Sequence, residues 1–172
     1  MEAGEVLVLG AGGSAASVLR ALGEDPPRRV WLLSRREEAG AALAERMRRL
    51  IAAPLQLAPL GDLPRLLPTA TILFNTTPLG MSPADPSPVP ADLLRGGLLV
   101  YDMVYRRDGR TLLQLQALAA GAEVTDGVAH VLAQGLPSFQ LLTGLEAPEA
   151  AMAAAVSQEI GRAPLRWGPG EA

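Results

Sequence analysis

Short apolar runs alternate with segments of helical periodicity along most of the chain. The first run, residues 5–9 (EVLVL), ends at Gly10, which is typical of a buried parallel strand. Residues 13–22 follow with apolar side chains at helical spacing. The same alternation predicts strands over residues 5–9, 29–33, 54–58, 71–74, 98–101 and 122–125. It predicts helices over residues 13–22, 37–50, 62–67, 111–120, 128–142 and 148–160, with Asp62 as the cap of the third.

This order of elements favours one fold class. Strands that alternate with helices predict a Rossmann-like, doubly wound α/β fold, with a mostly parallel six-stranded sheet and helices on both faces. Residues 75–90 contain five prolines, too many for a regular element, so this stretch is expected to be a loop. We expect one domain over residues 1–160 and a flexible tail over residues 161–172.

The amino-acid composition excludes several kinds of functional site. The 172 residues carry a net charge of −3, and all 15 cationic side chains are arginines. There is no lysine and no cysteine, and His130 is the single histidine, so disulfides, a Schiff-base lysine and a His/Cys zinc site are excluded and no metal is expected. A mildly acidic chain is a poor nucleic-acid binder. Without a long apolar run or a cationic leader, we expect no membrane partner and a cytoplasmic location.

The turn after the first strand is rich in glycine. It consists of Gly10, Ala11, Gly12, Gly13 and Ser14. With Ala15 it fits the G-x-G-x-x-A pattern of dinucleotide sites, in which Gly10 permits the turn and Gly12 leaves the backbone open to a pyrophosphate. The following helix offers its N–H groups to the phosphates. An ordinary glycine turn is the alternative, but a strand before it and a helix after it favour nucleotide binding.

The end of the second strand indicates which dinucleotide is bound. NAD sites place a carboxylate there for the ribose hydroxyls, whereas this chain has Ser34, Arg35 and Arg36. A guanidinium can hydrogen-bond a 2′-phosphate, so NADP is favoured as the cofactor. Alternatively, both arginines are solvated surface charges. Glu37 and Glu38 are expected in the first turn of the next helix, where its dipole favours them.

Four further segments resemble the shikimate dehydrogenase family. Residues 75–81 (NTTPLGM) and 101–105 (YDMVY) resemble two of its motifs, and residues 34–36 (SRR) are similar to its N-R-T cofactor motif. Residues 127–144 resemble its G-x-x-M-L-x-x-Q-G-x-x-S-F-x-x-W-T-G ending. With the glycine turn, the resemblance covers about residues 5–160.

The resemblance implies an oxidoreductase that transfers a hydride between NADPH and 3-dehydroshikimate, on the route to aromatic amino acids. Family members have a substrate domain with a catalytic Lys and Asp, and an NADP domain; this chain resembles the second. By this resemblance, Gly10, Gly12 and Gly13 hold the pyrophosphate, and Arg35 meets the 2′-phosphate with Ser34 beside it. Asn75, Thr76, Thr77, Met103 and Gly127 line the cofactor, whereas Tyr105 and Gln134 reach the substrate.

Departures from the family pattern limit what is expected of these 172 residues. The substrate domain has no counterpart in them, and a chain without lysine cannot supply the catalytic lysine. His130 stands where the family has Met, Leu142 where it has Trp, and Arg106 and Arg107 where it has x-Pro. Tyr105 and His130 are candidate proton donors, although a lone histidine on a helix is more typically a packing residue. We therefore assign no catalytic residue and expect NADP(H) binding with little or no shikimate turnover.

Two other functions stay open on the sequence. A non-catalytic NADPH sensor or subunit would dock a partner chain or a second copy through apolar residues of the last two helices. A methyltransferase also uses a glycine-rich first turn, but it needs an acidic residue after the second strand, where this chain has Arg35. Whether the small-molecule substrate is shikimate or quinate is also open. Asp102 is equally compatible with a turn or cap role.

Overall fold

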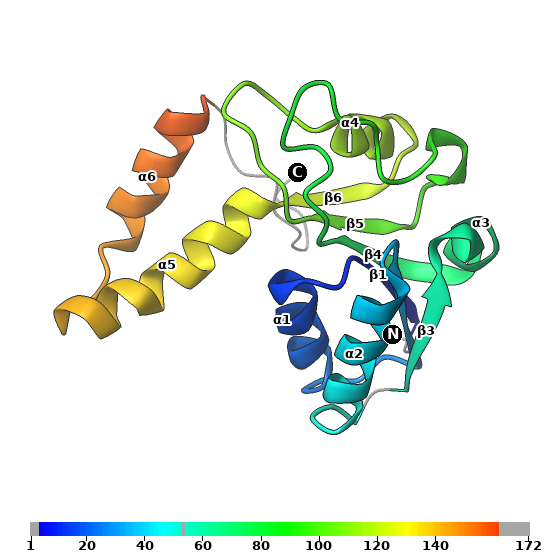
Figure 1. Cartoon of the computed structure of the whole chain (residues 1–172). Coiled ribbons are helices and arrows are strands. Elements are labelled where there is room, and N and C mark those ends of the chain that lie inside the picture. The colour runs from blue at the N-terminus through cyan, green and yellow to red at the C-terminus, as the bar shows by residue number, and fades with distance from the viewer. Residues whose placement is uncertain (1–3, 53, 162–172) are drawn as a thin grey trace.

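The computed structural model describes residues 4–52 and 54–161, and Figure 1 shows a central sheet flanked by helices. Six strands form the sheet: β1 (Glu5–Leu9), β2 (Arg29–Ser34), β3 (Leu55–Pro59), β4 (Ala70–Asn75), β5 (Leu99–Asp102) and β6 (Glu123–Asp126). Their order is β3-β2-β1-β4-β5-β6, and every pairing is parallel. The Rossmann-like prediction is confirmed, and the sheet is wholly rather than mostly parallel.

The helices follow the strands as the sequence predicts. They are α1 (Gly13–Leu22), α2 (Glu37–Arg48), α3 (Leu63–Leu66), α4 (Leu112–Ala119), α5 (Gly127–Thr143) and α6 (Glu149–Ile160). Three short 3-10 turns complete the set: η1 (Leu60–Asp62), η2 (Leu67–Thr69) and η3 (Ala91–Leu93).

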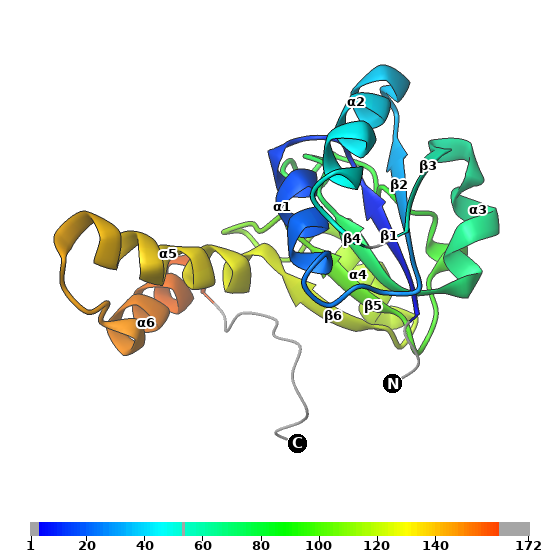
Figure 2. The ribbon, with the colours of Figure 1, turned by 90° about the horizontal axis from the view of Figure 1, so that it is seen from below.

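Strand alternation divides the apolar core between the two faces of the sheet. On β1, Val6 and Val8 pack with α1 and α2, whereas Leu7 and Leu9 pack with α3 and α4. Each of these four side chains is at most 1% exposed. Figure 2 shows α1 and α2 on one side of the strands and α3 on the other. Because both faces are covered, the strands read as continuous apolar runs in the sequence.

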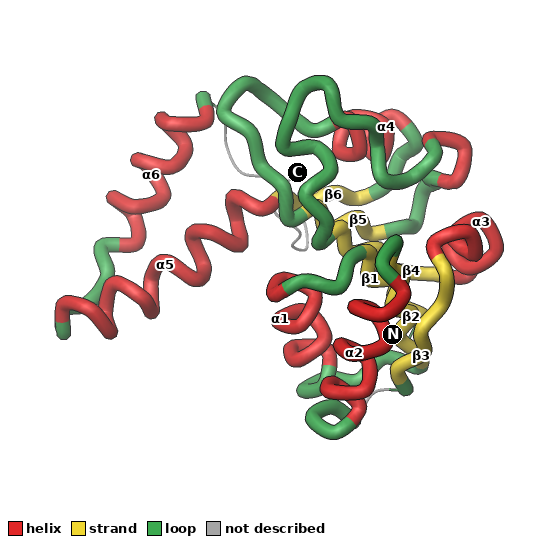
Figure 3. Tube along the Cα trace, in the orientation of Figure 1, coloured by secondary structure: helices red, strands yellow, loops and turns green. Residues whose placement is uncertain are grey.

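The strands end at a common level, and this positions the site. Leu9 is in register with Leu33 and Asn75, Asn75 with Asp102, and Asp102 with Asp126. The chain order reverses between β1 and β4, which are neighbours in the sheet. In open parallel sheets, ligands bind outside the carboxyl ends of the strands at this reversal. Figure 3 shows loops gathered beyond these strand ends.

Helices α5 and α6 form a hairpin that projects away from the sheet (Figures 1 and 2). An ion pair of 2.8 Å joins Glu159 of α6 to Arg107 of the loop after β5. Near the tip of the hairpin, Leu141 and Leu142 are each 86% exposed. In the described part of the chain, no helix has the length and apolar character to cross a membrane.

The short helix expected over residues 62–67 is present, but the cap expected from the Asp62 side chain is not. The helix expected over residues 62–67 is a single turn of α-helix, α3, between η1 and η2. Asp62 precedes α3 but its side chain caps no N–H group; it accepts from Arg65 instead. Pro68 lacks the N–H group that a further turn of helix would need, whereas Pro64 lies in the first turn, where proline is tolerated. Of the predicted tail, residues 162–172 lie outside the described residues.

Candidate functional site

The glycine turn between β1 and α1 packs directly against the loop after β4. Gly10 has a φ of +111°, and a Cβ there would lie 2.7 Å from the hydroxyl oxygen of Thr76. That hydroxyl and the Thr76 N–H both donate to the Leu9 carbonyl, at 2.6 and 3.0 Å. Gly10 therefore cannot carry a side chain, since the turn needs a left-handed conformation and this close approach.

The outer side of the turn is open. A Cβ built on Gly12 or Gly13 would meet no atom within 4 Å, and both residues are exposed. Gly12 is the N-cap of α1, with no side-chain cap and no acidic residue in the first turn. The first N–H groups of α1 thus have no side-chain acceptor among the described residues, which is the arrangement that binds phosphate groups. Ser14 is exposed beside them, and Ala11 is half-buried.

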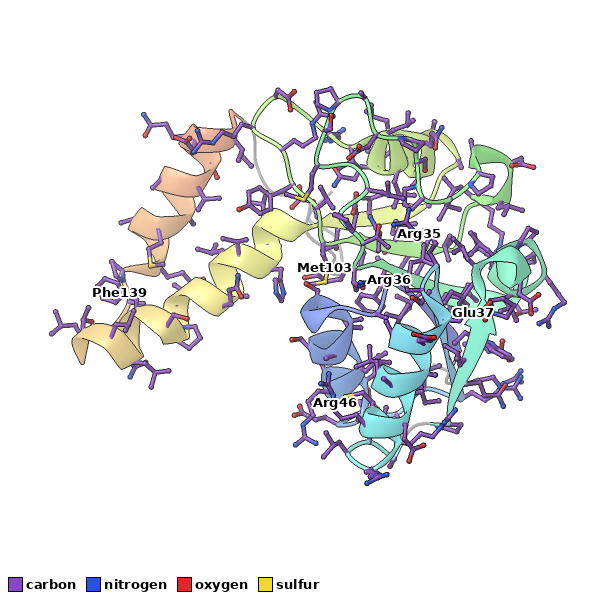
Figure 4. All side chains as sticks on the ribbon, viewed as in Figure 1. Arg35, Arg36, Glu37, Arg46, Met103 and Phe139 are labelled. Atoms are coloured by element: carbon purple, nitrogen blue, oxygen red, sulfur yellow. The ribbon has the colours of Figure 1, made fainter. Side chains whose placement is uncertain are left out.

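The turn after β2 carries two arginines. The buried Ser34 hydroxyl accepts from the Arg36 N–H at 3.2 Å and donates to the Arg36 carbonyl at 3.0 Å, which closes the turn. Arg35 and Arg36 are exposed, and neither guanidinium forms an ion pair with a described residue. Figure 4 shows both at the carboxyl end of the sheet, the end at which Met103 also lies.

A hollow of about 310 Å³ lies beside these arginines, lined by Ser34, Glu37, Leu57, Ala58 and Pro59. Glu37 and Glu38 occupy the first turn of α2, as the sequence predicts. In that turn they interact favourably with the helix dipole. The two arginines consequently keep their charge available to a ligand.

Asn75 ends β4 and organises the loop that follows. Its side chain is fully buried; the amide donates to Asp102 Oδ1 at 2.8 Å and to the Leu79 carbonyl at 3.3 Å. Its oxygen accepts from the N–H and hydroxyl of Thr77, at 3.1 and 2.6 Å. Because these atoms are already bonded within the protein, Asn75 holds the loop that borders the space beyond the carboxyl ends of the strands, called the crevice from here on, and its amide has no free hydrogen to offer a ligand.

Asp102 is the centre of a buried polar network. Oδ1 accepts from Asn75 and from the Val104 N–H at 3.2 Å. Oδ2 accepts from the Thr111 hydroxyl at 2.6 Å and from Gln114 Nε2 at 3.1 Å. Burial raises the pKa of Asp102, while the four donated hydrogen bonds oppose that shift.

The structure brings Met103 and Gly127 together at the mouth of the crevice. A Cβ on Gly127 would overlap the Met103 carbonyl. Asp126 precedes Gly127, and its side chain accepts from the Val128 N–H at 3.1 Å, which caps α5. Burial and the nearby Asp126 raise the pKa of Tyr101 on the neighbouring strand. The close approach explains why a glycine begins α5.

The predicted substrate residues are less firmly placed. Tyr105 is 46% exposed, and Gln134 is exposed on α5. No hydrogen bond between described residues joins either side chain to the network. His130 is half-buried, one turn beyond Gly127 on the same helix. Residues three and seven apart share a helix face, so His130 and Gln134 lie on the face of Gly127.

Sequence reasoning missed Thr111 and Gln114, which are 0% exposed. They form a capping box at the start of α4, with the Gln114 N–H donating to Thr111 Oγ1 at 3.1 Å and the Thr111 N–H donating to Gln114 Oε1 at 3.2 Å. The T-x-x-Q spacing is a signature of this motif and could have identified them. Their bonds to Asp102 leave no such trace in the sequence.

The strand order, the open glycine turn at the reversal point and the arginine-bearing turn beside it define a Rossmann-type α/β domain. No protein-family model matches the chain. The chain is nevertheless homologous to shikimate dehydrogenases over about nine tenths of its length. It spans only about half the length of the curated relatives that it matches.

Three similar proteins illustrate this homology. The shikimate dehydrogenase (NADP(+)) of Halobacterium salinarum is 39% identical over 156 residues, which cover 91% of this chain and 56% of the relative. The structure of shikimate 5-dehydrogenase from Thermus thermophilus, in complex with NADP(H) and shikimate, is 32% identical with a TM-score of 0.73, covering 92% and 56%. Quinate dehydrogenase from Corynebacterium glutamicum, in complex with NAD, is 25% identical with a TM-score of 0.79, covering 87% and 53%.

Proposed function

We propose that this chain binds NADP(H) as the cofactor half of a shikimate dehydrogenase-like oxidoreductase. One juxtaposition carries the proposal: an open glycine turn at the start of α1 lies beside a turn whose two arginines have no partner among the described residues. The homology supports it, because the similar proteins include NADP-dependent shikimate dehydrogenases. Solved relatives hold either NADP(H) or NAD, so the charge at residues 35 and 36 decides in favour of NADP.

Each part of the crevice then has a task. The N–H groups of Gly12, Gly13 and Ser14 donate to the diphosphate, and the Arg35 guanidinium binds the 2′-phosphate. Arg36 adds a second positive charge beside it. The backbone of Thr76 and Thr77 borders the cofactor, and Met103 and Gly127 border the nicotinamide. When bound, NADPH supplies a hydride.

For the substrate side of the site, we propose roles for three residues: Tyr105, His130 and Gln134. Reduction of a carbonyl also needs a proton for the nascent alkoxide, and Tyr105 and His130 are the candidate donors near Met103. Tyr105 and Gln134 would face a small polyhydroxy acid, 3-dehydroshikimate or the quinate analogue. We propose that these 172 residues bind cofactor without appreciable turnover, because nearly half the length of the relatives has no counterpart in them. Residues 1–160 as one domain, and a cytoplasmic location, stay predictions.

Titration with NADPH and NADH tests the cofactor assignment. The chain should bind NADPH more tightly, and Arg35→Ala should weaken NADPH binding by about 10- to 100-fold, the worth of a charge-assisted phosphate contact. NADH binding should hardly change. Arg46→Ala is the matched control, because Arg46 is an exposed arginine of α2 far from the crevice in Figure 4. Equal affinity for both coenzymes, or no binding of either, would contradict the proposal.

A non-catalytic NADPH-binding subunit is the second candidate. It shares with the first candidate an exposed apolar surface on the α5–α6 hairpin, Leu141, Leu142 and Leu145, which would dock a partner protein or a substrate domain in either case. The two functions differ in a turnover assay with NADPH and 3-dehydroshikimate, after a separately produced substrate domain of a relative is added. Turnover in the mixture supports the oxidoreductase; cofactor binding without turnover supports the subunit.

A further inference from the structure

The buried network around Asp102 connects loops that lie on one half of the crevice only. It contains Asn75, Asp102, Thr111 and Gln114, each 0% exposed. We propose that Thr111 and Gln114 are positioning residues for the nicotinamide end of the cofactor. Acting through Asp102, they hold the Met103–Tyr105 segment and the Thr77–Leu79 segment in place. The inference rests on the proposed function, since it assigns residues to one part of that site.

The first connection is the peptide chain at Val104. The Val104 N–H donates to Asp102 Oδ1 at 3.2 Å, and the Val104 carbonyl accepts from Gln114 Nε2 at 3.0 Å. Both polar groups of this buried residue are thus fixed from beneath. Met103 and Tyr105 flank Val104 in the chain, so the directions of their side chains depend on these two bonds.

The second connection runs to the loop after β4. Asp102 Oδ1 also accepts from Asn75, and Asn75 in turn holds Thr77 and the Leu79 carbonyl. Gly80, at the end of this segment, packs on Thr111: a Cβ there would lie 3.1 Å from the Thr111 methyl group. One carboxylate therefore sets two loops that border the proposed nicotinamide position.

Thr111 and Gln114 control the orientation of that carboxylate. They provide both hydrogen bonds of Oδ2, at 2.6 and 3.1 Å. The capping box fixes the two residues relative to each other. A buried carboxyl oxygen that loses a hydrogen-bond donor must turn toward another, because no solvent replaces the bond. Loss of either side chain should therefore move both loops.

The adenosine half of the crevice is joined to this network only indirectly, through Thr76, which follows Asn75 in the chain and donates to the Leu9 carbonyl before the glycine turn. No hydrogen bond among the described residues runs from the network to residues 10–14 or 34–36. The glycine turn is held by Leu33 and Thr76, and the arginine turn by Ser34. The lack of a direct bond gives the proposal a specific signature: disruption should weaken binding of the nicotinamide end more than binding of the adenosine end.

The test compares two probes on the full chain. NADPH reaches both halves of the crevice, whereas adenosine 2′,5′-bisphosphate reaches only the adenosine half. The variants are Thr111→Val and Gln114→Met, which remove the hydrogen bonds of one side chain to Asp102 and of the capping box at nearly constant volume, and Thr111→Ser, which retains the hydroxyl. Thr125→Val is the control, because Thr125 is also a buried threonine beside the site and its hydroxyl has no partner in the described structure.

In Thr111→Val and Gln114→Met, NADPH affinity should fall about tenfold, whereas the affinity for the bisphosphate should change less than about twofold. The change in nicotinamide fluorescence on binding should be reduced, and Thr111→Ser should restore both readouts. Thr125→Val should match the unaltered chain.

Equal losses for the two probes would show a merely structural role and overturn the proposal, as would unchanged NADPH binding. If Thr111→Val fails to fold, Gln114→Met and Thr111→Ser decide the question on the same readouts. If the unaltered chain binds neither probe, the proposed function itself fails. If the unaltered chain binds NADPH and adenosine 2′,5′-bisphosphate with equal affinity, the nicotinamide end adds nothing to binding. In that case only the positioning role fails.

Discussion

Gly127 begins α5 directly against the Met103 carbonyl, where a Cβ would overlap main-chain atoms. Backbone cannot rotate away as the end of a flexible side chain can. Gly127→Ala should therefore separate the β6–α5 turn from the loop after β5 and destabilise the fold by about 1–3 kcal/mol, as overpacking does. Urea unfolding followed by circular dichroism measures this.

Gly135, on the same helix, provides the control for that prediction. A Cβ there would lie 3.3 Å from the terminal methyl group of Met152, which can move aside. Alanine also favours helix more than glycine does, so Gly135→Ala should leave stability unchanged or raise it by up to about 1 kcal/mol. Equal effects of the two substitutions would show that the contact with Met103 does not explain Gly127.

The environment of an individual residue was predictable from the sequence only where a motif spans neighbouring positions. The opening at Gly12 and Gly13 follows from the G-x-G-x-x-A pattern and is confirmed as exposed backbone. The buried state of Asn75 was not predictable, because it depends on Asp102, 27 positions further along the chain. A short motif records which residue types are present but not which of their atoms are already bonded.

Glu5 joins three elements at the amino edge of the sheet. Its carboxylate, on β1, accepts from Arg28 at 2.8 Å, from Trp31 of β2 at 3.1 Å and from Thr69 of η2 at 3.1 Å. Glu5 is only 6% exposed, and the hydrogen bond from Arg28 is the largest cause of its lowered pKa. The carboxylate therefore stabilises the fold fully at pH values above its ordinary pKa of 4.5.

As the pH falls below that ordinary value, the unfolded chain takes up the proton first, and the stabilisation is lost as the pH passes through the lowered pKa of Glu5. Glu5→Gln should cost about 1–3 kcal/mol near pH 7, with a difference that shrinks in acid. Thermal unfolding across the pH range measures both. Glu45→Gln, at an exposed glutamate that pairs with two arginines, should change stability little.

Element boundaries were predicted well wherever periodicity ran over several turns. The helix expected over residues 128–142 is observed as Gly127–Thr143, although Pro137 lies inside it. The helix expected over residues 62–67 is one α-helical turn between two 3-10 turns, since a short stretch with prolines at positions 64 and 68 fits helix and 3-10 turn equally. The projection of α5 and α6 from the sheet was not predictable, because it depends on what the helices contact, not on their own pattern.

For the molecule as a whole, cofactor binding and folding are coupled by mass action. A ligand that binds only the folded chain, at about 100 times its dissociation constant, adds about 2.7 kcal/mol to the free energy of unfolding. For a chain of this size, NADPH should raise Tm by roughly 5–10 °C. NADH at the same concentration should raise Tm less. Differential scanning fluorimetry measures both shifts, and identical shifts would contradict the preference for NADP.

The fold class was predictable at this scale because each local pattern agreed with the next, from the strand–turn–helix at Gly10 to the last helix. The site was predictable only at its openings. A buried hydrogen-bond network lies beneath the site, and it is formed by three segments that are distant in the sequence. Its members are Asn75, Asp102, Thr111 and Gln114. The register between β4 and β5 places Asn75 opposite Asp102. This register is set by how the strands pair, so the sequence of either strand alone does not predict it.

The glycine turn has a consequence for how coenzyme choice can evolve. Every residue except proline keeps its main-chain N–H group, so the proposed binding of a diphosphate would tolerate most substitutions at Ala11 or Ser14. In the proposed site, coenzyme preference would depend instead on Arg35 and Arg36, two exposed side chains that form no ion pair with a described residue. A lineage could thus exchange one nicotinamide coenzyme for another through two surface replacements, while the scaffold beneath stays intact.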